Sequence, residues 1–249
     1  MKDSGLWVVE QAGSRGPHVV MIHGAMDRHN SFRRTMSRLG EHHIWAYDRR
    51  GYGRSGRADA TCDFAKHVAD LMTIVDEEPA VLIGHSMGGL VALHAAAVYP
   101  KRILAVGAFE PPAPWKPWWP DMWIPDPSDS DEEVVRNFHE RVMGPDSWDR
   151  IASTLRAQYV GEGHALRNDL EVGLHNPLFD PVEIVAPVVM GHGSESTPHH
   201  IRAVNEFVDE LPDAELVVIE GSAHGAHRSH PDAFSLFVAK TIARVPRSQ

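Results

Sequence analysis

Short apolar segments alternate with amphipathic segments along most of the chain. Six of these segments are mainly apolar and about as long as a buried strand: residues 17–23, 43–47, 80–83, 103–109, 188–191 and 215–219. Helices are expected at residues 31–39, 64–77, 87–99 and 199–210 and after Pro231, and residues 6–11 are expected to form one antiparallel strand. Strands that alternate with helices predict an α/β fold, in which helices flank a mostly parallel central sheet.

The alternation stops between residues 111 and 181. This segment opens with the proline-rich sequence PPAPWKPWWPDMWIPDP, where a helix is implausible, and residues 130–143 and 147–159 then predict two helices. The strand pattern resumes at residue 188. We therefore expect a core of residues 1–110 and 182–249, with residues 111–181 as a helical cap inserted before the penultimate core strand. The acidic run at 126–133 is expected to be a solvated helix N-terminus.

Composition excludes several classes of protein. The 249 residues are 43% hydrophobic and 23% charged, which is typical of a globular chain rather than a disordered or fibrous one. A net charge of −10 argues against nucleic acid or an anionic membrane as partner. No apolar segment approaches the roughly 20 residues of a membrane helix, and the N-terminus lacks a signal-peptide core, so we expect a cytoplasmic protein. The single cysteine, Cys62, excludes an internal disulfide and a cysteine zinc site.

One motif carries the chemistry of a nucleophile. Gly84-His85-Ser86-Met87-Gly88 is a G-x-S-x-G sequence between an expected strand and an expected helix. Its serine stands on a sharp, strained turn, so the positions two before and two after it must be small. The helix that follows directs its N-terminal dipole at the place where negative charge develops. The context favours Ser86 as a nucleophile over the alternative, a glycine-rich turn with an incidental serine.

Three further segments resemble the α/β-hydrolase family around its nucleophile. Residues 23–25 (His-Gly-Ala) end the first buried strand, where the family has its oxyanion loop, and residues 48–55 (DRRGYGRS) resemble its D-x-x-G-x-G-x-S turn. His224 follows the last strand, where the family has its catalytic histidine. The resemblance covers nearly the whole chain. It implies His224 as general base, the backbone N–H groups of Ala25 and Met87 as oxyanion donors, and no cofactor or metal.

The 17 histidines allow a second interpretation of this region. His227 and His230 follow His224 at three-residue spacing, which would suit metal ligands on a helical turn. However, glycines and a proline interrupt any regular helix there, and no HExxH sequence or carboxylate cluster accompanies the histidines. We expect His227 to have a local structural role. The pair at 199–200 is expected to be exposed, and the side chain of His23 to be structural.

The triad acid is the point at which this chain departs from the common family pattern. In most members a carboxylate follows the penultimate strand, but here that turn reads GSES, with Ser196 at the expected position and Glu195 one residue early. Some relatives, haloalkane dehalogenases and zearalenone-type lactone hydrolases among them, place the acid at the end of the strand before the cap, where this chain has Glu110. Pro111 should hold Glu110 extended, so that its side chain projects off the strand. We favour Glu110 and keep Glu195 as the alternative acid, whose task is to orient the histidine and stabilise its imidazolium form.

Four tryptophans near the start of the expected cap suggest the substrate. Trp115, Trp118, Trp119 and Trp123 fall within nine residues, and a cap at this place covers the catalytic face in the family. We predict that they line an apolar, aromatic or macrocyclic pocket together with Met26. Alternatively, they pack the cap onto the core or support a homodimer contact.

These predictions combine into a serine hydrolase that cleaves an ester or lactone bond of an apolar small molecule through an acyl-enzyme. A serine nucleophile excludes an epoxide hydrolase or dehalogenase that uses aspartate. Three alternatives share the same frame: a carbon–carbon bond hydrolase, a cofactor-free perhydrolase, and a small-molecule receptor without turnover.

Overall fold

The aliphatic segments of the chain form the strands of one sheet. The computed structural model describes residues 5–56, 64–120, 123–172 and 176–246; Cys62 lies outside these residues. The strands are β1 (Val8–Gln11), β2 (Arg15–Ile22), β3 (His42–Tyr47), β4 (Ala80–His85), β5 (Ile103–Phe109), β6 (Val188–Gly193) and β7 (Ala214–Ile219). In the described residues they form a seven-stranded sheet in the order β1-β3-β2-β4-β5-β6-β7, antiparallel at β1 and parallel elsewhere. The predicted α/β sheet is confirmed.

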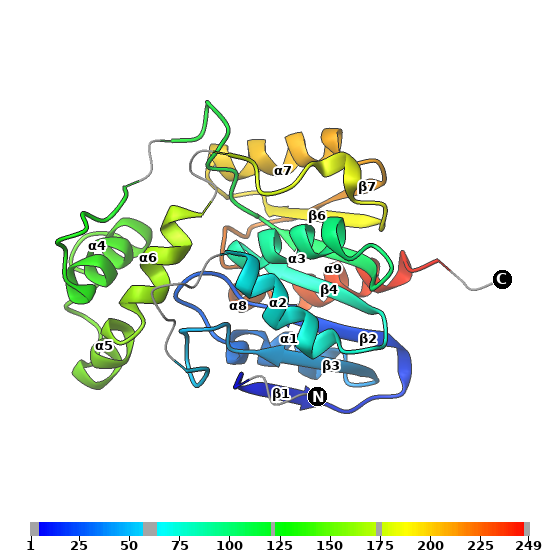
Figure 1. Cartoon of the computed structure of the whole chain (residues 1–249), viewed down its shortest axis with the longest axis horizontal. Helices are drawn as coiled ribbons and strands as arrows, with labels where there is room; N and C mark the ends of the chain where they lie inside the picture. Colours follow the sequence, from blue (N-terminus) through cyan, green and yellow to red (C-terminus); the bar gives the residue numbers. More distant parts are fainter. Residues whose placement is uncertain (1–4, 57–63, 121–122, 173–175, 247–249) are drawn as a thin grey trace.

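Helices cover both faces of the sheet (Figure 1). On one face lie α2 (Phe64–Val75), α3 (Met87–Val98) and α7 (Pro198–Glu210); on the other lie α1 (Arg33–Arg38), α8 (Ala226–Ser229) and α9 (Pro231–Ala243), with the short 3-10 helix η1 (His29–Phe32). The central strand β4 serves both cores, because Leu82 packs in the first and its neighbours Val81 and Ile83 pack in the second. None of the helices in the described part of the chain has the length and apolar character needed to cross a bilayer.

Three helices between β5 and β6 lie together at one end of the sheet (Figure 1). They are α4 (Asp131–Met143), α5 (Ser153–Val160) and α6 (Gly163–Glu171), and η2 (Pro181–Glu183) follows them. Their shared apolar cluster is centred on Val134, Trp148 and Leu166. A capping box of Ser130 and Glu133 begins α4, so the acidic run is a helix N-terminus as predicted. Because α4, α5 and α6 lie between β5 and β6, the insertion before the penultimate strand is confirmed. Its limits at residues 111 and 181 stay a prediction.

The helices of this insertion differ in part from the sequence prediction. The helix expected at 147–159 begins only at Ser153, because residues 145–150 form turns, and the pattern does not predict α6. Nor did the pattern predict the one-turn helix α8, since glycines and a proline surround it. Short helices such as α8 are stabilised by their tertiary contacts rather than by local propensity.

A buried ion pair joins this insertion to the core. Arg49, in the turn after β3, is fully buried and donates from both terminal nitrogens to Asp169 on α6, at 3.0 Å between Nη1 and Oδ1. The hydroxyl of Tyr52 donates to the same carboxylate at 2.7 Å. A second pair runs in parallel, from Arg28 to Glu162 at 2.6 Å. Because a buried charge without its partner is costly, these pairs fix α6 on the core.

Candidate active site

Ser86 occupies a tight turn between β4 and α3. Its backbone lies at φ 54° and ψ −124°, in the left-handed region that side chains adopt at an energetic cost. The flanking glycines are required by close approach: a Cβ on Gly84 would lie 2.2 Å from the carbonyl oxygen of Gly88, and one on Gly88 would lie 2.1 Å from that of Ile22. The N–H of Ser86 donates to the carbonyl of Phe109 at 2.9 Å, which ties the turn to β5. This is the sharp turn that the G-x-S-x-G sequence predicts.

The loop after β2, residues 23–27, packs directly on this turn; we call it the oxyanion loop. A Cβ added to Gly24 would lie only 2.9 Å from the Cβ of Ser86. Ala25 follows Gly24 in the loop, and Met87 is the first residue of α3, where backbone N–H groups have no acceptor within the helix. The two N–H groups predicted to bind an oxyanion therefore belong to segments that meet at Ser86.

The side chain of His23 holds this loop to the turn after β3. Its Nδ1–H donates to the carbonyl of Gly24 at 2.7 Å, and its Nε2 accepts the N–H of Arg49 at 2.8 Å. Burial lowers the pKa of His23 to about 4, so the ring is neutral and has both nitrogens bonded. The structural role expected for this side chain fits these bonds.

Glu110 and His224 form a hydrogen-bonded pair at the carboxyl end of the sheet. Glu110 Oε2 lies 2.7 Å from His224 Nδ1, while Oε1 accepts the N–H of Gly193 at 2.8 Å and the hydroxyl of Ser196. Burial favours the neutral acid, but the hydrogen bond and charge of His224, with the other two donors, lower the pKa of Glu110 below its ordinary value. A carboxylate at Nδ1 directs the other ring nitrogen of His224 to act as a base.

The structure brings Glu110, and not Glu195, to His224. The side chain of Glu195 is exposed, and its backbone N–H donates to the carbonyl of Ser222. Ser196, at the position where the family commonly has its acid, donates its hydroxyl to Glu110 instead. The position after β5 therefore supplies the carboxylate, and the position after β6 supplies a hydrogen bond to it.

The backbone of Glu110 corrects one prediction. Pro111 was expected to hold it extended, but Glu110 has φ 47°, in the left-handed region. Its N–H donates to the carbonyl of Gly191 at 2.9 Å, and its carboxylate accepts from Gly193, the last residue of β6. These bonds to β6 outweigh the local bias that a following proline imposes.

Two more histidine rings contact His224, each with its centroid 4.6 Å away. His85 donates from Nε2 to the carbonyl of His224 at 2.8 Å. His200 stacks on the ring, which corrects the prediction that the pair at 199–200 is exposed: only 16% of the His200 side chain is accessible. Burial lowers the pKa of His200 to about 3, and that of His85 falls for the same reason. Sequence spacing gave no signal for either contact.

The four tryptophans do not converge on one pocket. Trp119 alone lies beside the histidines, with its ring 5.4 Å from that of His200. Trp118 donates to Glu206 on α7 at 3.1 Å, and Trp115 lines a groove of about 750 Å³ whose lining excludes Ser86, Glu110 and His224. Trp123 and Met26 pack against the apolar cluster of α4, α5 and α6. Substrate binding by these side chains stays a prediction, best supported at Trp119.

Two groups of described side chains bring potential metal-ligand atoms within 4.8 Å of one another: Asp27, His85 and His227, and Glu110, His200 and His224. Both carboxylates already have hydrogen-bond donors. Asp27 accepts from His227 and Arg228, and Glu110 accepts from three groups. These hydrogen bonds occupy both carboxylates, and the absence of a metal stays a prediction.

Known proteins resemble this chain in both sequence and fold. Residues 19–235 match the model of the Alpha/beta hydrolase family. A pimeloyl-(acyl-carrier protein) methyl ester esterase of Vibrio campbellii is 26% identical over 94% of this chain and 97% of its own length. Epoxide hydrolase A of Mycobacterium tuberculosis is 35% identical, but the match covers 43% of this chain and only 36% of that protein. The crystal structure of the enol-lactonase from Burkholderia xenovorans superposes with a TM-score of 0.76 at 20% identity, covering 96% of each chain.

Proposed function

We propose that this chain, which belongs to the alpha/beta hydrolase family, is a serine hydrolase that cleaves ester bonds, lactones included, of apolar small molecules. One observation carries the proposal: a buried carboxylate, Glu110, is bonded to Nδ1 of His224, whose ring lies against the residue preceding Ser86. This arrangement supplies a nucleophile, a base and an acid that orients the base.

In the proposed first step, His224 Nε2 takes the proton of the Ser86 hydroxyl as its oxygen attacks the carbonyl carbon of the ester. The carbonyl oxygen becomes an oxyanion, which the N–H groups of Ala25 and Met87 stabilise. The Glu110 carboxylate stabilises the imidazolium form of His224. When the tetrahedral intermediate collapses, the carbon–oxygen bond of the ester breaks and His224 gives its proton to the leaving alcohol.

In the second step, a water molecule gives a proton to His224 and attacks the acyl-enzyme. The Ser86 ester bond breaks, and the serine oxygen recovers its proton from His224. A lactone follows the same course, except that its alcohol stays attached to the acyl group until water releases both together. Every proton has a donor and an acceptor among these groups, so the proposed reaction uses no cofactor or metal.

The named relatives support this class of reaction unequally. The esterase of Vibrio campbellii aligns over nearly the whole chain, which favours an ester substrate. The enol-lactonase shares the fold at 20% identity and therefore supports the architecture only. The match to the epoxide hydrolase covers about a third of that protein, and this chain has Ser86 where an aspartate nucleophile would be needed.

A fluorophosphonate probe tests the proposal directly, because it labels a serine only where a base and an oxyanion hole activate it. The native protein should be labelled on Ser86, and Ser86→Ala should be unlabelled and lose more than about 10³-fold in kcat on p-nitrophenyl esters. The matched control is Ser37→Ala, an exposed serine on α1, which should behave as wild type.

Two other results would overturn the proposal in favour of an alternative. A folded native protein whose Ser86 is not labelled would favour the receptor. Labelling accompanied by turnover of a carbon–carbon substrate, with p-nitrophenyl esters and aromatic lactones both inert, would favour a carbon–carbon bond hydrolase on the same triad.

A further inference from the structure

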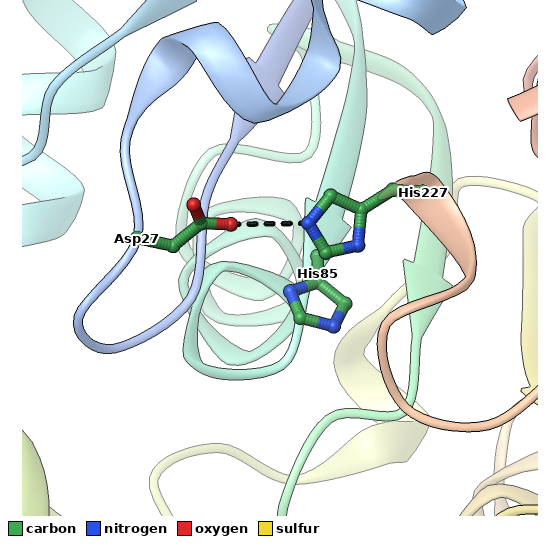
Figure 2. A group of neighbouring side chains, drawn as sticks. All are labelled: Asp27, His85 and His227. Atoms are coloured by element: carbon green, nitrogen blue, oxygen red, sulfur yellow. Dashed lines mark hydrogen bonds and ion pairs between the residues drawn. The ribbon is translucent and has the colours of Figure 1, made fainter. Parts of the chain in front are cut away.

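Three buried polar side chains beside the candidate site have no part in the proposed reaction: Asp27, His85 and His227 (Figure 2). Each lies close in sequence to a group that does. Asp27 ends the oxyanion loop, two residues after Ala25. His85 precedes Ser86, and His227 lies on α8, three residues after His224. Buried polar groups in such positions call for a physical explanation.

Hydrogen bonds and ring contacts connect the three side chains. In Figure 2 the Asp27 carboxylate and the His227 ring point toward one another, and Nε2 of His227 donates to Asp27 Oδ2 at 3.0 Å. The His227 ring lies 4.1 Å from that of His85, which in turn contacts His224 and donates to its carbonyl. A continuous chain of contacts thus runs from the oxyanion loop to the base.

Asp27 is charged in this position. Burial alone would raise the pKa of its carboxyl, but the hydrogen bond from His227, together with the charges of His227 and Arg228, lowers the pKa far below its ordinary value. Arg228 is the residue after His227 and donates to the other carboxylate oxygen. The backbone N–H of Arg28 also donates to Oδ1, at 2.8 Å. Both side chains that bond Asp27 therefore come from α8, the helix that follows the base.

The oxyanion loop needs such an anchor. Met26, between Ala25 and Asp27, has φ 51°, a left-handed conformation that is unfavourable for a residue with a side chain. Surrounding contacts must hold a residue in this conformation. The bonds from α8 act on the very next residue, so they fix the end of the loop that carries the Ala25 N–H.

We propose that Asp27 and His227 are positioning residues, whose hydrogen bond holds the oxyanion loop at a fixed distance from the loop of His224, residues 220–225 between β7 and α8. The inference rests on the proposed function, because it concerns the alignment of that reaction. An oxyanion donor and a base must both be placed to within a fraction of an ångström of the reacting ester, and a misplacement of about 1 Å can cost about 100-fold in rate. The bond connects the oxyanion loop to α8, 200 residues later in the sequence.

The test compares two substitutions of His227. His227→Phe retains a ring to pack against Phe32 and Phe234, whose centroids lie 5.4 and 5.9 Å away, but it cannot donate to Asp27. His227→Gln loses the ring and keeps an N–H donor. His230→Phe is the matched control, because it makes the same exchange three residues along, at a histidine whose Nδ1 bonds Ser229.

We expect His227→Phe to lower kcat on p-nitrophenyl butyrate, and the rate of fluorophosphonate labelling, by about 10- to 100-fold, with KM changed less than about threefold. His227→Gln should recover kcat to within about fivefold of wild type, and His230→Phe should match wild type. The double variant of Asp27→Asn and His227→Phe should be no slower than His227→Phe alone, since residues that act as a unit are not additive.

A role limited to stability would give different results. His227→Phe with an unchanged kcat, His227→Gln as slow as His227→Phe, or additive losses in the double variant would each overturn the positioning role. If His227→Phe fails to fold, Asp27→Asn and His227→Gln test the same bond. Labelling of wild-type Ser86 together with an unimpaired His227→Phe refutes only this inference, whereas unlabelled wild-type protein refutes the proposed function itself.

Discussion

Replacing Glu110 by glutamine changes one oxygen of the proposed triad into an amide group of the same size. The surrounding bonds fix how that amide must lie. The N–H of Gly193 and the hydroxyl of Ser196 both donate to Oε1, so the glutamine oxygen takes that position. The NH₂ group is then directed at His224 Nδ1, where the carboxylate oxygen lay at 2.7 Å.

An NH₂ group at Nδ1 forces the ring proton of His224 onto Nε2. That nitrogen can then no longer accept the proton of Ser86, and the imidazolium form loses its anionic partner. The equivalent acid-to-amide exchange in a Ser-His-Asp triad lowers kcat by about 10⁴-fold. We expect a loss of about 10³- to 10⁴-fold in Glu110→Gln, which is about 4 to 5.5 kcal/mol in activation free energy.

The assay measures kcat on p-nitrophenyl butyrate and the rate of fluorophosphonate labelling, with circular dichroism to check the fold. Glu195→Gln is the matched control, because its side chain is exposed and should change kcat by less than about twofold. If Glu110→Gln keeps kcat within tenfold of wild type, or if Glu195→Gln alone abolishes activity, the assignment of the acid is wrong.

Three further predictions concern stability, pH and substrate. Asp169→Ala leaves its buried arginine partner unpaired and should lower the free energy of unfolding in urea by about 3 to 5 kcal/mol. Arg136→Ala, in an exposed ion pair, should lower it by less than about 1 kcal/mol. If the two substitutions lowered the free energy of unfolding equally, the buried ion pair would not be what fixes α6 on the core. Burial lowers the pKa of His200 to about 3. Between about pH 6.5 and pH 3 this histidine is therefore protonated in the unfolded chain but not in the folded one, so the free energy of unfolding falls as the pH drops through that range. His200→Phe should reduce the slope of the unfolding free energy against pH by up to about 1.4 kcal/mol per pH unit, and an unchanged slope would contradict this. Trp119→Ala should raise KM for aryl esters about tenfold, and Trp115→Ala should raise it less than twofold. Steady-state kinetics measure both values, and a larger KM in Trp115→Ala would contradict the assignment of Trp119 to the pocket.

Features that depend on close sequence neighbours could be predicted. The strands follow from aliphatic runs, because β4 is buried on both faces and tolerates no polar residue before its end. The turn at Ser86 follows from its glycines, whose missing side chains leave room for the backbone of Ile22 and for the helix itself. In each case the residues that determine the structure lie within a few positions of one another, or, like Ile22, at the end of a strand that is followed by a motif of its own.

Features that depend on distant partners could not be predicted. Arg49 lies within a motif that resembles a family turn, yet its buried partner is Asp169, 120 residues later on a helix that the pattern did not indicate. Asp27 and His227 are 200 residues apart. The spacing of charges along a chain carries no information about such pairs, because the fold alone decides which loops meet.

The histidines illustrate the same limit. His199 and His200 stand at the start of an amphipathic helix, where local pattern predicts exposure. The structure instead packs the start of α7 beside the loop of His224, so His200 becomes part of the surroundings of the base. Burial lowers the pKa of His200 and of His85, and both rings stay neutral at neutral pH. A positive charge can then develop on His224 without a second imidazolium beside it.

The position of the acid follows from the parallel pairing of two strands. Phe109 at the end of β5 is in register with Gly191 on β6, so the residues that follow both strands emerge at the same edge of the sheet. A carboxylate from either strand end can therefore reach the same histidine nitrogen. In this chain Glu110 takes that place from β5, and Ser196, at the alternative position after β6, donates a hydrogen bond to it. In the proposed triad, Ser196 therefore supports a carboxylate that the neighbouring strand supplies.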